Sequence, residues 1–230
     1  MHVYAIGDLH LSFSSDKPMD VFGPAWRNHA ARLEDAWRAR VSEEDLVLIP
    51  GDISWAMQLK GASPDLAFIG RLPGKKLLLR GNHDYWWSSL TQVRAALPEG
   101  TYALQNDAFC CGGLCVAGSR GWSCPGGSGF TLTDEKIYQR ELQRLELSLA
   151  RVPPGRRTVV MLHFPPFNER RQASGFTRLI EDSGAELAVY AHLHGAAQKN
   201  AFEGTLNGVR YLLVAADHLD FTPRLLLEDV

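Results

Sequence analysis

The sequence predicts a mixed α/β fold in which two β-sheets pack face to face and helices cover their outer faces, a four-layer αββα sandwich. Two observations favour this fold. Strand-length apolar runs alternate with helix-like segments in the N-terminal half, and a second group of strand-like runs with its own helices follows. A chain of 230 residues with 45% hydrophobic residues can bury a substantial core, and we expect one domain over residues 1–230.

The N-terminal half has a βαβα rhythm. Strands are expected at residues 2–6, 46–50 and 77–79, where apolar runs stop at glycine or polar residues. Helices are expected at residues 26–40, 65–72 and 88–97, with a loop or short helix at 54–62. The first helix has apolar residues at helical spacing, and Pro64 is expected to begin the second because proline suits the first helical turn.

After Pro98 the pattern becomes richer in strands. Three short runs at residues 101–104, 108–111 and 114–118, joined by polar or glycine turns, predict a β-meander. Thr133 is expected to cap a helix that reaches Arg151. Further strands are expected at residues 158–162, 187–191, 201–206, 209–215 and 224–227, with a helix at 177–183. The pair Asn207-Gly208 indicates a hairpin between two of these strands.

Five of the predicted strands end in side chains that can bind metals or move protons. These ends read Gly7-Asp8-Leu9-His10, Gly51-Asp52, Gly81-Asn82-His83-Asp84, His163 and His192-Leu193-His194. Each could be an ordinary turn if taken alone, because glycine, asparagine and aspartate favour turns. Their recurrence at strand ends instead predicts a site at the carboxyl edge of the sheets, where α/β folds place their chemistry.

In this order the blocks resemble those of the calcineurin-like metallophosphoesterases, which read Asp-x-His, Gly-Asp, Gly-Asn-His-Asp/Glu, His and Gly-His-x-His. The resemblance extends from Asp8 to His194, with Ala191 in place of the usual glycine of the last block. It implies the same αββα fold and a binuclear, metal-dependent phosphohydrolase.

The resemblance also implies two sets of metal ligands. Asp8, His10, Asp52 and His194 would hold one divalent ion, and Asp52, Asn82, His163 and His192 would hold the other. The shared ligand is a carboxylate because an anionic oxygen can bridge two cations and offset their repulsion. Oxygen and nitrogen ligands without thiolate suit Mn, Fe, Zn or Co better than Ca.

This metal pair predicts the reaction. A metal-bridging hydroxide would attack the phosphorus of a phosphate ester while the two ions neutralise its oxygens. His83 is expected to act as the catalytic acid that protonates the leaving oxygen, or as a hydrogen-bond donor to the transition state, and Asp84 is expected to orient the ring of His83.

Residues beyond the metal ligands suggest the kind of substrate. Arg120 follows a predicted strand and could contact phosphate, and we favour it over Arg80, Arg170 and Arg171. Core packing is the alternative for the tryptophans that follow strand ends, but their rings could also stack on a flat group. We therefore predict a small organic phosphodiester or a nucleotide as substrate, bound with help from Trp55, Trp86 and Trp122.

Other functions remain open at this point. The same site could serve a phosphomonoesterase or a protein phosphatase, and the same fold could be a non-catalytic scaffold. A scaffold could have lost ligands, whereas all seven are present. A metal-dependent amidohydrolase is less consistent with the chain, because its His-x-His lies on the first strand of a large barrel.

Composition limits the partners and the location. The net charge of -2 gives no basic face for general nucleic-acid binding, and no apolar run reaches the roughly 18 residues of a membrane span. We expect a cytoplasmic protein, and hence small apolar packing roles rather than disulfides for Cys110, Cys111, Cys115 and Cys124. His2, His29 and His218 lie outside the matched blocks, and we assign them to packing or the surface.

Overall fold

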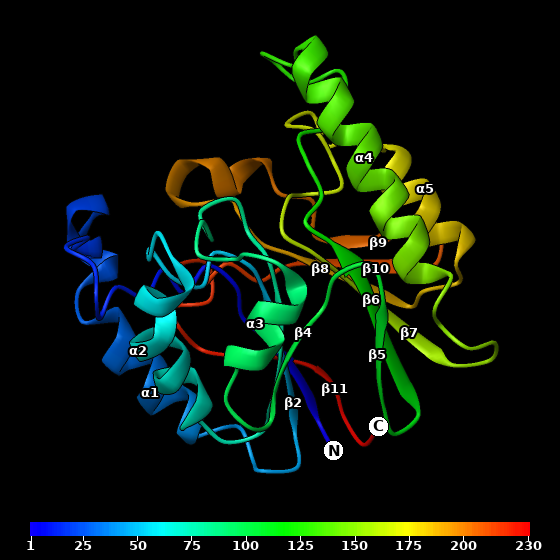
Figure 1. Ribbon diagram of the computed structural model, residues 1–230. Helices are drawn as coiled ribbons and strands as arrows, with labels where there is room; N and C mark the ends of the chain where they lie inside the picture. Colours follow the sequence, from blue (N-terminus) through cyan, green and yellow to red (C-terminus); the bar gives the residue numbers. More distant parts are fainter.

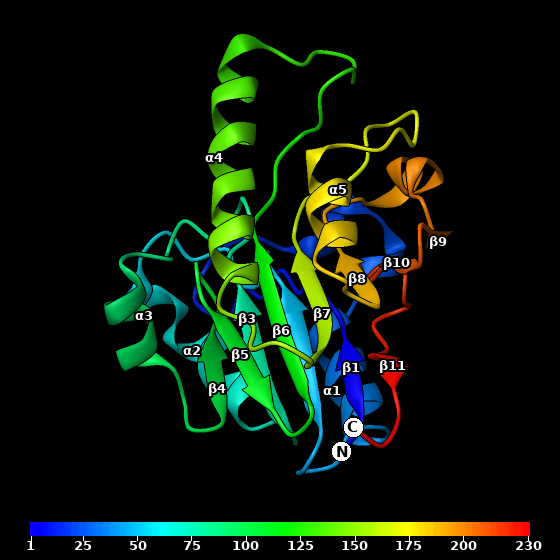
Figure 2. The same ribbon diagram turned by 90° about the vertical axis from the view of Figure 1, so that its right-hand side faces the viewer.

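The computed structural model describes residues 1–230, and it has the four layers that the sequence predicts. Two mixed sheets pack against each other, and helices cover the outer face of each (Figure 1). The polypeptide begins and ends at the same end of the sandwich, where the Val230 amide donates a 2.9 Å hydrogen bond to the Met1 carbonyl (Figure 2).

The first sheet has five strands in the order β11-β1-β2-β3-β4. Their bounds are β1 Val3–Ala5, β2 Leu46–Pro50, β3 Lys75–Leu79, β4 Thr101–Ala103 and β11 Arg224–Leu227. Strands β1 to β4 run parallel to one another, and β11 pairs antiparallel with β1 at the edge. The carboxyl ends of β1, β2 and β3 therefore meet at one edge of this sheet.

The second sheet has six strands in the order β5-β6-β7-β8-β10-β9. Their bounds are β5 Ala108–Cys111, β6 Leu114–Ser119, β7 Arg157–Leu162, β8 Leu187–Tyr190, β9 Gly204–Leu206 and β10 Val209–Leu213. Strands β6, β7, β8 and β10 are parallel. The predicted hairpin is confirmed, because β9 and β10 are antiparallel and Asn207 and Gly208 between them have positive φ angles.

Burial on both faces explains why the strands read as continuous apolar runs. In β2, Leu46 and Leu48 pack between the two sheets, whereas Val47 and Ile49 face the helices. The strand period of two produces this division, since successive side chains point to opposite faces. The sandwich thus has one core between the sheets and one under each helical layer.

The helices form the two outer layers. The first sheet is covered by α1 His29–Arg38, α2 Leu59–Gly70 and α3 Leu90–Ala96, and the second by α4 Leu132–Leu149 and α5 Gly175–Asp182 (Figure 1). Three short 3-10 helices also occur: η1 Met19–Phe22, η2 Pro24–Trp26 and η3 Gly195–Asn200. None of the helices is both long enough and apolar enough to cross a membrane.

Two helix boundaries differ from the prediction. Pro64 does not begin a helix but lies inside α2, whose buried side chains on both sides of Pro64 pack on the sheet. The stabilisation from burying these side chains thus outweighs the loss of the backbone hydrogen bond that proline cannot donate. The cap of α4 is Thr131 rather than Thr133, because Thr131 forms a reciprocal capping box with Asp134.

The expected meander after Pro98 is wrong. Strand β4 joins the first sheet beside β3, whereas β5 and β6 form an antiparallel hairpin in the second sheet. This connection carries the chain from one sheet to the other. The cysteine prediction is also wrong in part, because Cys110 and Cys115 form a disulfide across this hairpin, while Cys124 is a buried core residue as expected.

Candidate metal centre

The predicted ligands all lie just beyond the carboxyl ends of β1, β2, β3, β7 and β8. The loops after β1 and β2 run side by side, with the Asp8 amide bonded to the Gly51 carbonyl and the His10 amide bonded to the Asp52 carbonyl, each at 2.9 Å. Parallel pairing within each sheet and packing between the sheets therefore bring residues that are far apart in the sequence to one place.

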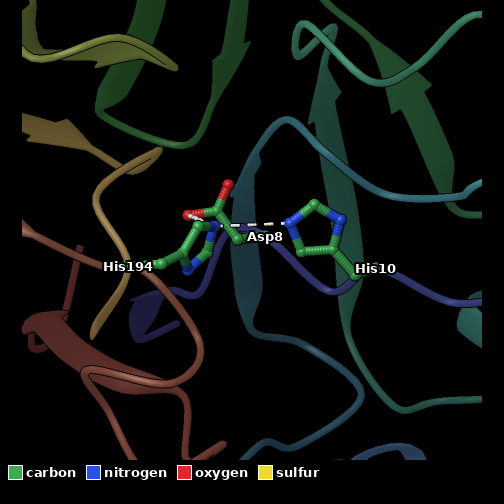
Figure 3. Close-up of side chains that lie close together, drawn as sticks. All are labelled: Asp8, His10 and His194. Atoms are coloured by element: carbon green, nitrogen blue, oxygen red, sulfur yellow. Dashed lines mark hydrogen bonds and ion pairs between the residues drawn. The ribbon is translucent and has the colours of Figure 1, made fainter. Parts of the chain in front are cut away.

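The first ligand cluster consists of Asp8, His10 and His194, whose ligand atoms lie within 4.8 Å of one another. His10 Nε2 and His194 Nε2 face each other at 3.4 Å, beside the carboxylate of Asp8 (Figure 3). The distance from His194 Nε2 to Asp8 Oδ2 is 3.8 Å. All three residues converge on one point from two different sheets.

The second ligand cluster consists of Asp52, His163 and His192, and its ligand atoms also lie within 4.8 Å of one another. Asn82 belongs to the same place, since its Oδ1 lies 2.7 Å from His163 Nε2. The structure therefore brings together the predicted residues and separates them into the two predicted groups.

Asp52 lies between the two clusters. Its Oδ2 is 3.9 Å from His10 Nε2 in the first cluster and 3.5 Å from His163 Nε2 in the second. Its Oδ1 accepts a 2.8 Å hydrogen bond from the His83 amide, which fixes the carboxylate in this orientation. One oxygen is thus anchored to the loop after β3, and the other faces both groups of ligands.

Hydrogen bonds donated by the ring nitrogens that face away from the ligand clusters orient two of the imidazoles. His163 Nδ1 lies 2.9 Å from the Pro50 carbonyl, and His194 Nδ1 lies 2.9 Å from Asp217 Oδ1. A ring nitrogen that donates to such an acceptor leaves the other nitrogen free to bind a metal. Asp217 was missed at the sequence level, although it follows the predicted strand at residues 209–215 just as other site residues follow theirs.

Burial and crowding set the charges of these groups. Burial lowers the pKa of His163 to about 3 and that of His192 to about 2, so both imidazoles are neutral and able to coordinate. Burial also lowers the pKa of His194, but the hydrogen bond to Asp217 and the charge of Asp8 outweigh it and raise that pKa to about 9. Burial raises the pKa of Asp8 well above its usual range.

The backbone at the site is unusual. Asp8, His10, Asp52 and His192 all have positive φ angles, between 45° and 73°, in the left-handed region that non-glycine residues rarely occupy. Such conformations cost roughly 1–3 kcal/mol each and cluster at functional sites. The surrounding strands therefore hold the backbone of these four residues in a conformation that unfolded chains rarely adopt.

The glycines of the motifs make room for this geometry. A Cβ at Gly81 would collide with Oδ1 and the amide nitrogen of Asp52 and would lie 2.8 Å from its Cγ. Gly51 has a φ of 91°, and a Cβ there would lie 2.7 Å from the Gly81 backbone. Glycine is therefore required where the loops after β2 and β3 touch.

The site has the features that bound divalent cations require. Asp8 Oδ1 is buried without a hydrogen-bond partner, and an orphaned carboxylate oxygen is costly unless a cation meets it. The ligand atoms are carboxylate and amide oxygens and imidazole nitrogens, the donor set of Mn, Fe, Zn and Co sites. The residues present therefore fit a centre of divalent transition metals.

His83 and Asp84 do not interact as predicted. The Asp84 carboxylate accepts hydrogen bonds from the amides of Ile53, Ser54 and Gly81 and from Trp86 Nε1, and none from the ring of His83. It ties the loops after β2 and β3 together. The half-buried His83 ring instead lies 4.7 Å from the ring of Trp55 and 6.0 Å from that of His10.

Of the three tryptophans expected to contact substrate, Trp55 and Trp122 are half-buried, whereas Trp86 is 1% exposed and belongs to the core. The prediction for Trp86 is therefore wrong, since its indole packs under the site and donates to Asp84. Trp55 stacks on His10 with ring centroids 4.9 Å apart. Trp122 donates to Asp134 at 3.0 Å and packs on Phe164 with ring centroids 4.8 Å apart.

Arg120 does not contact the ligand clusters through its side chain. Its guanidinium lies 3.4 Å from the buried Glu141 and above the ring of Trp122. Burial lowers the pKa of Arg120, and the charge of Glu141 opposes that effect. The carbonyl of Arg120, however, accepts the His163 amide at 3.1 Å, so this residue adjoins the centre.

A cavity of about 270 Å³ opens beside the second cluster. His192 lines one side, and Phe164, Phe167 and Asn168 line another. Phe164 packs on His192 with ring centroids 4.1 Å apart. A molecule bound in this cavity would reach the metal ligands directly.

The chain is similar to known proteins in both sequence and fold. A family described as calcineurin-like phosphoesterase matches residues 1–196. Two curated proteins, both named Gene 66 protein, are 36% identical over 77 residues in Mycobacterium phage L5 and 36% identical over 87 residues in phage D29. These matches cover 34% and 36% of this chain, and 37% and 40% of the phage proteins.

Solved structures share the fold over nearly the whole chain. The phosphopantetheinyl hydrolase PptH from Mycobacterium tuberculosis has a TM-score of 0.60 and 15% identity, covering 99% of this chain and 96% of its own. The protein TT1561 of Thermus thermophilus has a TM-score of 0.58 and 11% identity, covering 92% and 88%. The protein AQ665 of unknown function from Aquifex aeolicus has a TM-score of 0.52 and 15% identity, covering 97% and 95%.

Proposed function

The chain belongs to the calcineurin-like phosphoesterase family, and on that premise we propose that it hydrolyses small organic phosphodiesters or nucleotides at a centre of two divalent transition metal ions. The observation that carries this proposal is the position of Asp52 Oδ2 between the two ligand clusters. A single metal site would have no use for two converging sets of ligands that share one carboxylate.

Each residue has a role in this proposal. Asp8, His10 and His194 would hold one ion, His163, His192 and Asn82 would hold the other, and Asp52 would be a ligand to both. When bound, the ions supply a nucleophile from water near neutral pH and neutralise the charge of the phosphoryl oxygens. Asp217 and the Pro50 carbonyl keep the imidazoles of His194 and His163 in the orientation for coordination.

His83 is the proton donor in this proposal. Its backbone amide donates to Asp52 Oδ1 at 2.8 Å, and its ring centroid lies 6.0 Å from that of His10, next to the first cluster. The ring nitrogens of His83 make no hydrogen bond within the chain, so the nitrogen that carries the proton is free to donate it to a leaving oxygen. General acid catalysis of this kind contributes roughly 10²–10⁴-fold to the rate.

The surroundings favour a small substrate with a flat group. The cavity beside His192 has about 270 Å³, close to the lower end of the range of about 300–1,000 Å³ for small-molecule pockets. Trp55 and Phe164 pack on ligand imidazoles of the two clusters. A half-exposed aromatic ring there can stack a base, which contributes roughly 1–3 kcal/mol.

The test compares metal content and turnover in the purified protein. Stripped protein and protein reconstituted with Mn, Fe, Zn or Co are assayed on bis(4-nitrophenyl) phosphate and 4-nitrophenyl phosphate. We expect activity with about two metals bound per chain, and loss of both metals and activity in Asp52→Asn. Asp16→Asn, at an exposed surface position, is the matched control. Full activity of the stripped protein or of Asp52→Asn would contradict the proposal, and bound metals without turnover of any ester would favour a scaffold.

A further inference from the structure

A second cavity adjoins the metal centre on the side of β3 and β6. It has about 80 Å³, enough for a small polar group since a water molecule takes about 30 Å³ in the liquid. Arg80 at the end of β3, Arg120 at the end of β6 and Arg144 of α4 line it together with Glu141. Its lining is thus cationic, with three arginines and one carboxylate.

The charges in this cavity do not balance. Glu141 is fully buried, and its Oε1 accepts from Arg144 at 2.7 Å and lies 3.4 Å from Arg120. Arg80 forms no ion pair, and the Nε atoms of Arg80 and Arg120, like Glu141 Oε2, are buried without a hydrogen-bond partner. Buried guanidinium donors without acceptors are costly, and an anion in the cavity would satisfy them.

The backbone connects residues that line this cavity to residues of the second ligand cluster. Arg80 precedes Asn82 by two residues, and the Arg120 carbonyl accepts the His163 amide at 3.1 Å. Two residues of the cavity lining, Arg80 and Arg120, are thus tied directly to the segments that carry Asn82 and His163.

The cavity beside the second cluster has the opposite character. The cavity beside His192 is lined by no lysine or arginine, and it includes two carboxylates, Asp134 and Glu169. An anionic extension of the substrate would be repelled there and attracted by the three arginines. The two cavities therefore suit different parts of a bound molecule, one anionic and one uncharged.

We propose that the cavity of Arg80, Arg120 and Arg144 binds a second anionic group of the substrate, a phosphate or a carboxylate, while the phosphoryl group to be hydrolysed lies at the metal ligands. This inference rests on the proposed function for the reaction. Arg120 is held for this purpose by Glu141 and by the ring of Trp122, 4.7 Å away. The substrate is then a phosphate ester with at least two anionic groups.

Binding tests the inference without requiring turnover. The dissociation constants of propylphosphonate, propane-1,3-bisphosphonate and 3-phosphonopropanoate are measured by calorimetry on the metal-loaded protein, with longer-chain analogues in parallel. We expect the two ligands with a second anionic group to bind about tenfold or more tightly than propylphosphonate. A preference for only one of them identifies that anion as phosphate or carboxylate.

Arg144→Gln should remove this preference and leave propylphosphonate binding unchanged, while Arg144→Lys should retain part of it. Arg151→Gln, at an exposed position outside the cavity lining, is the matched control. Arg144 is half-exposed, and thermal melting checks that the variants fold. Equal affinity for all three ligands, or equal behaviour of Arg144→Gln and Arg151→Gln, would overturn the inference.

The corresponding phosphate esters separate this inference from the proposed function. If the bisphosphonate binds tightly through Arg144 but no ester is hydrolysed, the proposed function fails and the anion site stands. If all esters are hydrolysed with the same KM in wild type and in Arg144→Gln, the proposed function stands and the anion site does not exist.

Discussion

Replacing Gly81 by alanine gives the sharpest test of how the backbone builds the centre. The new methyl group would lie 2.8 Å from Asp52 Cγ and closer still to its Oδ1 and amide nitrogen. Carbon atoms prefer separations of about 3.5–4.0 Å, so the Asp52 carboxylate and its backbone amide both have to move by about 1 Å relative to Gly81. Gly81 does not have a positive φ, so the effect is one of contact and not of backbone strain.

The displaced group is the carboxylate that faces both clusters. A misplacement of about 1 Å can lower a rate about 10²-fold, and overpacking of this kind costs about 1–3 kcal/mol of stability. We therefore expect Gly81→Ala to lose kcat on bis(4-nitrophenyl) phosphate by about two orders of magnitude and to bind less metal by elemental analysis. In the control Gly61→Ala, the nearest atom would be Ala56 Cβ at an ordinary 3.5 Å, and activity should persist. A Gly81→Ala protein with full metal content and unchanged kcat would refute this reasoning.

Three further predictions concern the surroundings of the ligands. His83→Ala should keep its metals but lose about 10²–10⁴-fold in kcat on alkyl esters, and less on nitrophenyl esters, which need little protonation; equal losses would exclude proton donation. Asp217→Asn should weaken metal binding about 10- to 100-fold in titrations, because Asp217 orients His194. Asp220→Asn, at an exposed position, is the control and should bind metal as tightly as the wild type. Equal metal affinities of the two variants would show that Asp217 does not support His194. Trp55→Ala should raise KM for nucleotide esters but not for methyl phosphate. Trp86→Ala should instead lower the free energy of unfolding by about 3–5 kcal/mol in denaturant titrations. A raised KM and unchanged stability in Trp86→Ala would show that Trp86 contacts the substrate.

The sequence predicted the strands that lead to the site because β1, β2 and β8 are buried on both faces and polar ligands follow each of them closely. It did not predict where the chain changes sheets. The runs that became β4 and β5 are both short and both followed by turn residues, and local pattern does not reveal which sheet each joins. That choice depends on packing, since Ala103 lies under the helices of the first sheet and β5 pairs with β6 in the second.

The residues of the centre were predictable from their types and order, whereas the interactions that support them were not. Asp84 follows His83 directly, which suggested a contact between their side chains, but the backbone turns so that the carboxylate points to the loop after β2. Trp86 was expected at the rim because of its place in the sequence. Two residues beyond Asp84, the chain has already turned into the core, and only the fold shows this.

Ala191 shows how the fold accommodates a departure from the family pattern. A Cβ placed on Gly7 would lie 2.8 Å from the Ala191 Cβ and 2.8 Å from Pro50 Cγ, so the methyl group of Ala191 occupies space that Gly7 leaves empty. Both residues directly precede a ligand, Asp8 and His192, and the His192 amide donates to Asp8 Oδ2 at 2.7 Å. The two ligand loops approach each other so closely that the glycine at position 7 has to face a residue no larger than alanine at position 191. With Gly7 opposite it, a methyl group at position 191 fits without displacing either ligand.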